Sequence, residues 1–472
     1  MSTLKKDLRK DLKKGVKILG GDYLLSVSPD KMCALLEPLK PDAVFPRDEA
    51  LKQLREFLKT QGIISGLHSE PRFEGGRWVL AEGKPPMRGK DARLEWFVPI
   101  DPPDNSEAKK VDLRERNAII CVDEGERIAK LHPPTSGVPG KDIFGEEIPP
   151  QRGRELQLET NEWVDFDPET GVFRALKAGV LRVYPSRIEV HPEFWLDGNV
   201  DWDTGNVRFR GEKLTITGDV KRGFKLFAQG DVEIHGNIED ETEVVVNGDL
   251  LVEGLVHGEG ARLLCQGNAR LGAIEYARVE VKGDLVITDY ALQAEIQVGR
   301  NFICTEGVGA VVGGRLTVEG GVLVRILGSR AHVATLIRAG YNHHLAQRIE
   351  ELESKLLLLR EEKEPYLKIL KLGIKLLKEG ELPRSRMEAL ARLKKKLALL
   401  LEEEKKLQKQ LEELRKTQEH LETKARIKVT DRLFPGVTIE VGPGKFTVAE
   451  GLAGGVFFLK NGILRYLSLS EK

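Results

Sequence analysis

Carboxylate side chains recur beside glycine in the middle of the chain, where they could bind a metal ion or act on a sugar. Asp231, Asp249 and Asp284 each follow a glycine within the pattern apolar-x-apolar-x-Gly-(Asp/Asn)-apolar-x-apolar. Stacked carboxylates would form a ladder of oxygen ligands or of acid–base groups. Asn268 takes the same place without loss of the pattern, which turn chemistry tolerates and a metal site usually does not. We therefore interpret these residues as structural corners: Gly218, Asp219, Gly230, Asp231, Gly248, Asp249, Gly267, Asn268, Gly283 and Asp284.

A loop rich in proline and glycine, residues 133–150, is the second candidate site. Its Val138–Lys141 part is similar to a phosphate loop, but it fails the G-x-x-x-x-G-K-[ST] test because residue 135 is Thr and Asp142 follows the lysine. We interpret the loop as a rigid turn in which Phe144 enters the core. The alternative is a partner- or ligand-binding loop, formed by Pro134, Gly137, Pro139, Gly140, Lys141, Phe144 and Gly145.

Other reactive side chains show no catalytic spacing. The nine histidines lack metal-ligand spacing, and we expect the adjacent His343 and His344 to form a surface pair at a helix start, because neighbours on a helix point in different directions. The four cysteines lie far apart without a C-x-x-C, which suits a reducing cytoplasm. No G-x-S-x-G or H-E-x-x-H is present. We therefore expect no enzyme activity, no cofactor and no metal.

The composition excludes further classes. Lys+Arg and Asp+Glu are equal at 74 each, so the chain lacks the basic excess of a protein that coats nucleic acid, and we expect no nucleic-acid partner. The sequence contains no apolar run of about 18 residues, so we expect no membrane span. The charged N-terminus has no apolar h-region of a secretory signal. A length of 472 residues suggests about three ordinary domains.

The glycine corners must be positioned by a repeat. Residues 198–340 contain 23 of the 48 glycines, and no proline occurs between Pro192 and Pro365. The steps between the glycines at 230, 248, 267 and 283 are too short for a strand plus a crossover helix, which takes about 30 residues. They predict coils of a right-handed parallel β-solenoid, each with three strands of about five residues. Tandem six-residue repeats, typical of left-handed acyltransferase helices, are missing.

The repeat makes three detailed predictions. Val246, Cys265 and Val281 should stack as one buried column, each corner glycine should have a positive φ, and the Asp or Asn beside it should bond local backbone. Gly218-Asp219 should begin the series, and Arg300-Asn301 and Gly314-Arg315 should be degraded copies near its end.

A charged, leucine-rich stretch, residues 345–424, predicts an antiparallel helical hairpin with heptad seams on two arms of about 38 residues. Gly380–Pro383 should end the first arm, and Ser385–Glu388 should restart the helix as a capping box. Pro365 should kink the first arm. Such a hairpin fits a spacer or docking arm. After it, strands resume, and Asn461-Gly462 should turn a β-hairpin that caps the solenoid.

The N-terminal third reads as a mixed α+β domain. Asp22–Ser28 and Ala118–Val122 should be strands, and Arg47–Thr60 should be an amphipathic helix that Gly62 stops. Residues 1–15 are rich in lysine and carry Leu4, Leu8 and Leu12 at helical spacing.

Several motifs in order resemble the flagellar assembly protein A (FapA) family. These are P-P-T-x-G-x-P-G-x-D-x-F-G at 133–145, Gly198–Asp201, the Gly-Asp coils, the coiled coil and Phe434–Val437. The resemblance starts at about residue 20, and the family's solenoid is similar to that of bactofilins, which are bacterial scaffold proteins. It implies a cytoplasmic, non-enzymatic role in flagellar assembly or polar placement, with the cell pole as one location and other proteins as partners.

Together these features predict a mainly β protein with a long α-helical insertion. The expected parts are an α+β domain at 1–190, the solenoid at 191–341, the hairpin at 342–425 and capping strands at 426–472. The leading functional hypothesis is a scaffold or adaptor that acts through the N-terminal domain and the coiled coil, and we expect a homo-oligomer. The alternatives are a self-assembling, bactofilin-like structural protein and a ligand- or nucleotide-responsive regulator.

Overall fold

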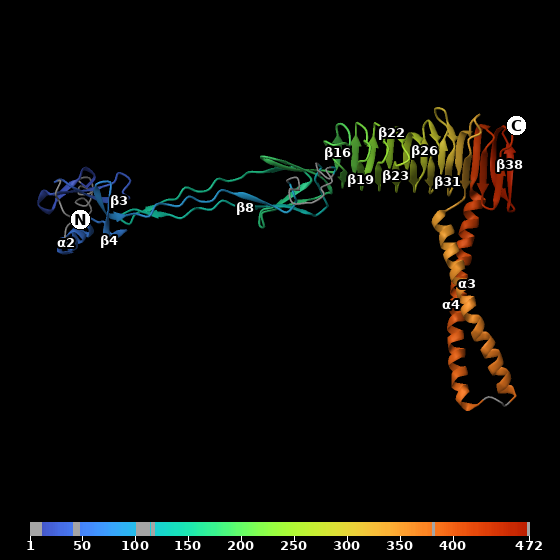
Figure 1. Cartoon of the computed structure of the whole chain (residues 1–472). Helices are drawn as coiled ribbons and strands as arrows, with labels where there is room; N and C mark the ends of the chain where they lie inside the picture. The colour runs from blue at the N-terminus through green and yellow to red at the C-terminus, as the bar shows by residue number, and fades with distance from the viewer. Residues whose placement is uncertain (1–11, 41–47, 101–113, 115–118, 380–382, 470–472) are drawn as a thin grey trace. The chain divides into compact units, whose positions relative to one another are not determined.

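The computed structural model describes residues 12–40, 48–100, 114, 119–379 and 383–469 (Figure 1). The chain forms two compact units. The first comprises Met1–Val98, Arg127–Arg174 and Val183–Ile188, and the second comprises Pro99–Glu126, Ala175–Arg182 and Glu189–Lys472. The division into four parts from the sequence stays a prediction.

The first unit starts with an antiparallel sheet and one helix. The sheet has the order β1-β2-β3-β5-β4, and α2 supplies Leu54 and Leu58 to the core beside it. The predicted strand at 22–28 and the predicted helix at 47–60 are confirmed. Gly62, which follows the helix, has a φ of 84°, in the left-handed region. Leu12 is buried in the same core, whereas Leu4 and Leu8 lie outside the described residues. The bounds are β1 Val16–Ile18, β2 Tyr23–Val27, β3 Cys33–Pro38, α2 Asp48–Thr60, β4 Leu67–Glu74 and β5 Arg77–Glu82.

Shorter strands follow before the solenoid. Two form the ribbon β9–β10, and four form a sheet in the order β12-β13-β8-β6. The strand predicted at 118–122 is shorter, and Ala118 lies outside the described residues. The bounds are β6 Arg93–Trp96, β7 Cys121–Val122, β8 Arg127–His132, β9 Gly140–Lys141, β10 Glu147–Ile148, β11 Glu159–Thr160, β12 Val164–Asp167, β13 Val172–Ala175, β14 Gly179–Tyr184 and β15 Arg187–His191.

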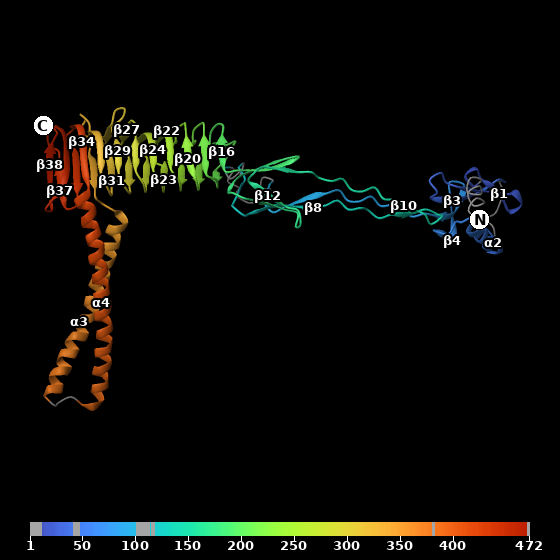
Figure 2. The same ribbon diagram turned by 180° about the vertical axis from the view of Figure 1, so that it is seen from behind.

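The predicted parallel β-solenoid is confirmed, and its coils build a 13-stranded and a 10-stranded sheet. Strands of each sheet follow one another along the solenoid in chain order (Figure 2). The 13-stranded sheet contains β16 Glu193–Leu196, β18 Lys213–Ile216, β20 Asp231–Ile234, β22 Leu250–His257, β24 Ala269–Glu275, β26 Leu285–Ile287, β27 Tyr290–Leu292, β29 Phe302–Cys304, β30 Ala310–Val312, β32 Val322–Leu327, β34 Arg426–Leu433, β37 Leu452–Lys460 and β38 Ile463–Ser468. The 10-stranded sheet contains β17 Val207–Phe209, β19 Lys225–Ala228, β21 Glu243–Val246, β23 Arg262–Cys265, β25 Arg278–Val281, β28 Glu295–Val298, β31 Gly314–Val318, β33 Thr335–Ala339, β35 Val437–Val441 and β36 Gly444–Thr447.

The third side of each coil is shorter than predicted. In the first coils it consists of single bridges, which pair Val200 with Val220, Val220 with Ile238, and Ile238 with Val256. Further along, β27 and β30 extend this side to three residues each. A coil of 16 to 19 residues spends most of its length on two four-residue strands and three corners, so little remains for a third strand.

Apolar side chains line the interior in register. Val246 pairs with Cys265, and Cys265 pairs with Val281, which confirms the predicted column. All three are at most 1% exposed. Because every inward side chain stacks on a similar one from the coil before, the solenoid has one continuous core.

The corner glycines do not have the predicted positive φ. Their φ angles lie outside the left-handed region, and the glycine is required by close approach between coils instead. A Cβ on Gly248 would lie 2.3 Å from Asp231 Oδ1 and 2.6 Å from the carbonyl carbon of Gly230. Coils stack about 4.8 Å apart, so backbone at a sharp corner leaves no space for a side chain.

The Gly-Asp pairs belong to two columns and not to one. The register pairs Val220 with Ile238, so Gly218-Asp219 stacks on Gly236-Asn237 at a different corner from Gly230-Asp231. Asn301 continues the column of Asp284, as predicted, but Gly314 lies inside β31 and is not a copy. Because two corners of one coil both carry a Gly-Asp or Gly-Asn pair, the spacing in the sequence does not show to which corner a given pair belongs.

The last strands close the solenoid as predicted. β34 and β35 add in parallel to β32 and β33, and β36, β37 and β38 then add antiparallel strands. Asn461 and Gly462 have φ angles of 55° and 74°, which makes the turn between β37 and β38 the predicted two-residue type.

The predicted hairpin leaves the solenoid between β33 and β34 as α3 His343–Lys378 and α4 Arg384–Lys424 (Figure 1). α3 continues as one helix through Pro365. The predicted capping box is wrong, because α4 starts one residue before Ser385 and Pro383 is its N-cap residue. Pro383 has an extended backbone, with a φ of −62° and a ψ of 143°, which is typical of an N-cap residue. No helix of the described residues is both long and apolar enough to cross a membrane.

Candidate functional site

The corner Asp and Asn side chains form ladders that connect coils. Oδ1 of Asp231 accepts a hydrogen bond from Asp249 N at 2.8 Å, and Oδ1 of Asp249 accepts one from Asn268 N at 2.7 Å. Asn268 and Asp284 continue the ladder to Asn301. The predicted bond to local backbone is therefore wrong, since each side chain reaches the next coil. Among the residues that the structure describes, no group of three or more His, Cys, Asp and Glu could hold a metal ion.

A second ladder follows the other corner. Asn199 Oδ1 accepts from Asp219 N at 2.8 Å, Asp219 Oδ1 from Asn237 N at 2.7 Å, and Asn237 Oδ1 from Leu255 N at 2.8 Å. Burial alone would raise the pKa of Asp219, but hydrogen bonds from Asn237 and Lys221 lower it below its ordinary value. Asp and Asn act alike at both corners because the bond to the backbone of the next coil needs only the Oδ1 acceptor, which both side chains have. The geometry is that of a backbone-satisfying ladder.

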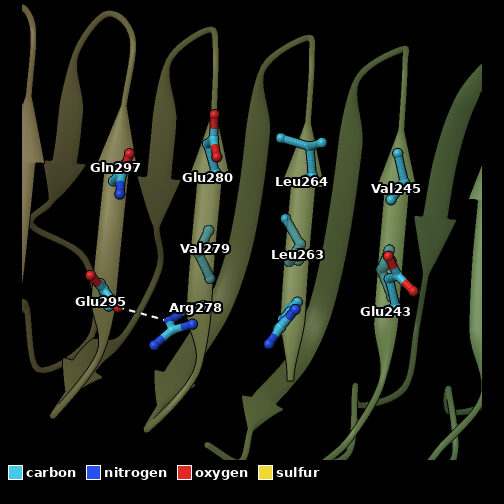
Figure 3. A pocket seen from close by; sticks show the side chains of 11 residues that line it. Glu243, Val245, Leu263, Leu264, Arg278, Val279, Glu280, Glu295 and Gln297 are labelled. Atoms are coloured by element: carbon cyan, nitrogen blue, oxygen red, sulfur yellow. Dashed lines mark hydrogen bonds and ion pairs between the residues drawn. The ribbon is translucent and has the colours of Figure 1, made fainter. Parts of the chain in front are cut away.

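The outer face of the 10-stranded sheet carries a shallow groove of about 450 Å³ (Figure 3). Val245 and Leu264 lie half-buried side by side in it, followed by Glu280 and Gln297 on the next strands. Beside this row, Arg278 Nε donates to Glu295 at 2.8 Å. The groove therefore has an apolar centre and a charged border on the outer face of the sheet. That arrangement suits contact with a protein surface better than the enclosure of a small ligand.

The 133–150 loop packs against residues 84–91 of the same unit. Val138 N donates to Met87 O at 3.0 Å, and Lys141 N donates to Lys84 O at 2.8 Å. A phosphate cradle needs such N–H groups to be free for the anion, so the backbone of this loop does not offer one. Of the other predicted loop residues, Gly137 and Gly145 have positive φ angles of 79° and 83°, and a Cβ on Gly140 would lie 2.5 Å from Lys84 O.

Phe144 is buried, at 7% exposed, and belongs with Ile143 to the core of the first unit. Asp142 fixes this turn, because its Oδ1 accepts from Phe144 N at 2.9 Å and from Glu146 N at 2.8 Å. Asp142 is itself only 3% exposed. The role of Pro134, Pro139 and the rest of the loop in partner binding stays a prediction.

An exposed apolar pair beside this loop was missed by sequence reasoning. Met87 is 67% exposed and Val138 is 58% exposed, and the two residues pair across an antiparallel bridge. Each residue alone is unremarkable in the sequence, and only the pairing of segments 84–91 and 133–142 brings them together. The bridge makes them one apolar spot on the first unit.

Polar contacts attach the hairpin to the solenoid. Asn342 caps α3 by accepting from Leu345 N at 2.7 Å, and its Nδ2 donates to Glu319 of the solenoid at 2.7 Å. On α4, Gln418 Nε2 donates to Gly340 O at 3.1 Å. Gly340 has a φ of 72°, and a Cβ there would lie 2.8 Å from Glu422 Cα, so the joint is tightly packed. His343 and His344 are exposed at this helix start, as predicted.

The seam of the hairpin contains one buried carboxylate. Glu404, in α4, is 8% exposed and pairs with Lys363 and Arg360 of α3. The hydrogen bond from Lys363 holds the pKa of Glu404 below its ordinary value. Leu352, Leu356 and Leu411 pack together in another part of the seam, near the start of α3 and in the second half of α4. Glu404 thus forms an interhelical ion pair within the apolar seam, and this pair fixes the register of the two helices.

The cysteines are free, and two of them are buried in the solenoid. Burial raises the pKa of Cys265 to about 11 and the pKa of Cys304 to about 12. Their thiols therefore stay protonated near neutral pH, where a thiol is a poor nucleophile. Both act as small apolar side chains of the core.

Comparison with known protein families agrees with this architecture. A model described as "Flagellar Assembly Protein A beta solenoid domain" matches residues 192–464, and one described as "Flagellar Assembly Protein A N-terminal region" matches residues 23–185. Searches of curated proteins and of solved structures each find no match. The matches span most of the chain and confirm the resemblance of its motifs, and the chain therefore belongs to the flagellar assembly protein A family.

Proposed function

We propose that this protein takes part in flagellar assembly as a non-enzymatic scaffold or adaptor in the cytoplasm, with the cell pole as its place of action. The family match supports the link to flagellar assembly. The observation that carries the scaffold role is a hairpin with helices of 36 and 41 residues, held to a continuous solenoid by polar contacts. At 1.5 Å per residue, α3 alone is about 54 Å long. Such an arm presents a binding surface and adds no globular core.

Removal of the arm tests this role. The joint at Gly340 and Glu422 brings the two ends of the hairpin together, so a short Gly-Ser linker can replace residues 345–424. We expect the shortened protein to keep its β-sheet circular dichroism and to lose partners in an affinity pull-down from the native host. A shortened protein that captures every partner of the full chain would contradict the arm hypothesis.

The N-terminal domain supplies the second contact surface in this proposal. The exposed pair Met87 and Val138 supports it, because adjacent exposed apolar side chains beside a rigid loop favour a protein contact. The double variant Met87→Ser/Val138→Ser should lose a subset of partners without a change in melting temperature. Leu39→Ser, at a separate exposed apolar residue of the same unit, is the control and should keep all partners.

Self-assembly is the second candidate function, and one observation favours it. β38 lies at the end of the 13-stranded sheet, and its Ile463 and Leu467 are 57% and 56% exposed. An edge strand with exposed apolar side chains pairs readily with another strand, and a second copy of β38 would fit it antiparallel. We propose this contact for the expected homo-oligomer.

Sedimentation velocity tests the oligomer. Leu467→Lys should convert the oligomer to a monomer, because a lysine on the edge opposes strand pairing. Leu399→Lys, at an equally exposed leucine of α4, should leave the oligomer unchanged. If only Leu399→Lys dissociates the oligomer, the contact lies on the hairpin and not on β38. If the wild-type protein is a monomer, the self-assembly hypothesis is wrong.

A further inference from the structure

The loop end of the hairpin combines exposed apolar side chains with a strong positive charge. We define the hairpin tip as residues 366–379 of α3 and 386–396 of α4. These segments contain nine lysine or arginine residues against two glutamates, whereas residues 343–365 and 397–424 contain ten against thirteen. The overall net charge of zero therefore conceals a basic tip. This charge favours an anionic occupant and opposes contact with the tip of a second copy, which would bring like charges together.

The apolar side chains of the tip are open to solvent. Ile369, Leu372, Ile374 and Leu377 of α3 are between 45% and 60% exposed, and Met387 of α4 is 47% exposed. The helices still meet between them, because Gly373 is buried and a Cβ there would lie 2.1 Å from Leu390 Cδ1. The seam at this point has no space for another side chain, so burial of these apolar groups has to come from outside the hairpin.

The exposed apolar side chains do not share one face. Leu372 and Leu377 lie five residues apart, so they project from α3 about 140° apart at 3.6 residues per turn. Ile369 and Ile374 have the same separation. A single helix laid in a groove covers one face only. A lipid headgroup region surrounds an inserted tip and contacts every face.

The cations lie where they would border such an insertion. Lys371, Lys375 and Lys378 recur on α3 at steps of four and three, so they share a stripe beside the apolar side chains. No described carboxylate lies within 4.0 Å of them, nor of Lys394 or Lys395 on α4. Long lysine side chains can bury their methylene groups in the interface and keep the ammonium at anionic headgroups. Clusters of four to eight such cations on an amphipathic helix are typical of binding to anionic lipid.

We infer that the hairpin tip docks on an anionic lipid surface, through the exposed apolar side chains and the lysines that border them. This inference rests on the proposed role of the hairpin as an arm and names the surface that the arm reaches. The tip is peripheral to the bilayer, since its apolar segments are far shorter than a span of about 20 residues. The hairpin would thus hold the solenoid at a membrane surface.

Vesicle co-sedimentation of the full chain tests the inference. We expect binding to vesicles of phosphatidylcholine with about one third phosphatidylglycerol, little binding to phosphatidylcholine alone, and a decrease with added salt. Lys371→Gln/Lys375→Gln/Lys378→Gln should weaken partition at least about 10-fold, because each cation near an anionic surface contributes roughly fivefold and three are removed. Ile369→Ser/Leu372→Ser should weaken it with the charge unchanged.

The matched control removes three exposed lysines outside the tip, as Lys405→Gln/Lys406→Gln/Lys409→Gln, and should bind like the wild type. If this control loses as much vesicle binding as the tip variant, the binding depends on net charge alone and the inference is wrong. Tip-dependent binding to poly-glutamate without vesicle binding would also overturn it, in favour of an acidic protein partner. Absence of vesicle binding leaves the pull-down of partners by the hairpin unaffected, so the two proposals fail separately.

Discussion

The solenoid and the hairpin differ in how completely they bury their apolar side chains. In the solenoid, inward residues such as Val246 and Cys265 stack coil on coil and are almost fully buried. In the hairpin, Leu358 and Leu372 are 65% and 60% exposed, and burial is confined to a seam between the two helices that includes Leu352, Leu400 and Leu411. A closed repeat has all its partners within the chain. A two-helix hairpin has one seam, so apolar residues outside that seam need a partner from elsewhere.

The two regions also use polar groups differently. The ladders of the solenoid satisfy backbone N–H groups between neighbouring coils, as Asp249 does for Asn268. The hairpin uses Glu404 to connect its helices by charge. Loss of a ladder contact is therefore a local change within a large core, whereas loss of the ion pair affects the only seam of the hairpin. Four predictions test this contrast, from the largest effect to the smallest.

The largest effect is expected at a solenoid corner. Gly248→Ala places a Cβ 2.3 Å from Asp231 Oδ1, so the two coils must separate. We expect the free energy of unfolding to fall by about 3 kcal/mol, measured by denaturant unfolding, because a close-packed stack cannot absorb the added group. The matched control is Gly321→Ala, where the nearest atoms are 3.4 Å and 3.5 Å away. Similar losses in both variants would show that coil spacing is not the cause.

The seam ion pair should come next. Glu404→Ala removes the carboxylate and leaves Lys363 partly buried without its partner, which should lower the stability of the hairpin by about 2 kcal/mol. Thermal unfolding followed by circular dichroism at 222 nm reports the helices. Glu402→Ala changes an exposed glutamate of the same helix near position 404 and should have almost no effect on the melting of the hairpin. An equal effect at 402 would assign the change to helix propensity.

A ladder variant should have a smaller effect. Asp249→Ala removes the acceptor for Asn268 N and should cost about 1 kcal/mol. Asp249→Asn should restore most of the stability, because Asn268 already performs the same task in the next coil. Failure of Asn to restore stability would indicate that the charge matters, and would reopen a role for the carboxylates beyond structure.

The smallest effect is a dependence on pH that is confined to the hairpin. The folded pKa of Glu404 lies below its ordinary value of 4.5, so its ion pair stabilises the hairpin above that value and is lost as the pH falls through the lowered pKa. Melting of the helices at pH 7 and at pH 3 should differ more for the wild type than for Glu404→Gln. An equal difference in both proteins would remove Glu404 as the cause.

Much of the fold could be predicted because it follows from local periodicity. The steps of 16 to 19 residues indicated stacked coils, and the heptads indicated the hairpin. The prediction that the corner glycines have a positive φ was wrong. Both a positive φ and close approach of another backbone require glycine, and the sequence does not distinguish these two causes. Gly218-Asp219 was assigned to the wrong corner for a similar reason, because two corners of one coil use the same residues. Exposed pairs such as Met87 and Val138 depend on contacts between distant segments.

The sequence by itself determined the kind of repeat, the hairpin and the family, because each of these is expressed in spacing between neighbours along the chain. Only the tertiary structure decided what each corner residue does and which side chains stay uncovered. The target of the Asp231 carboxylate lies one coil away, and the exposure of Leu372 depends on where α4 packs. Both are contacts across space, which the order of residues along the chain does not specify.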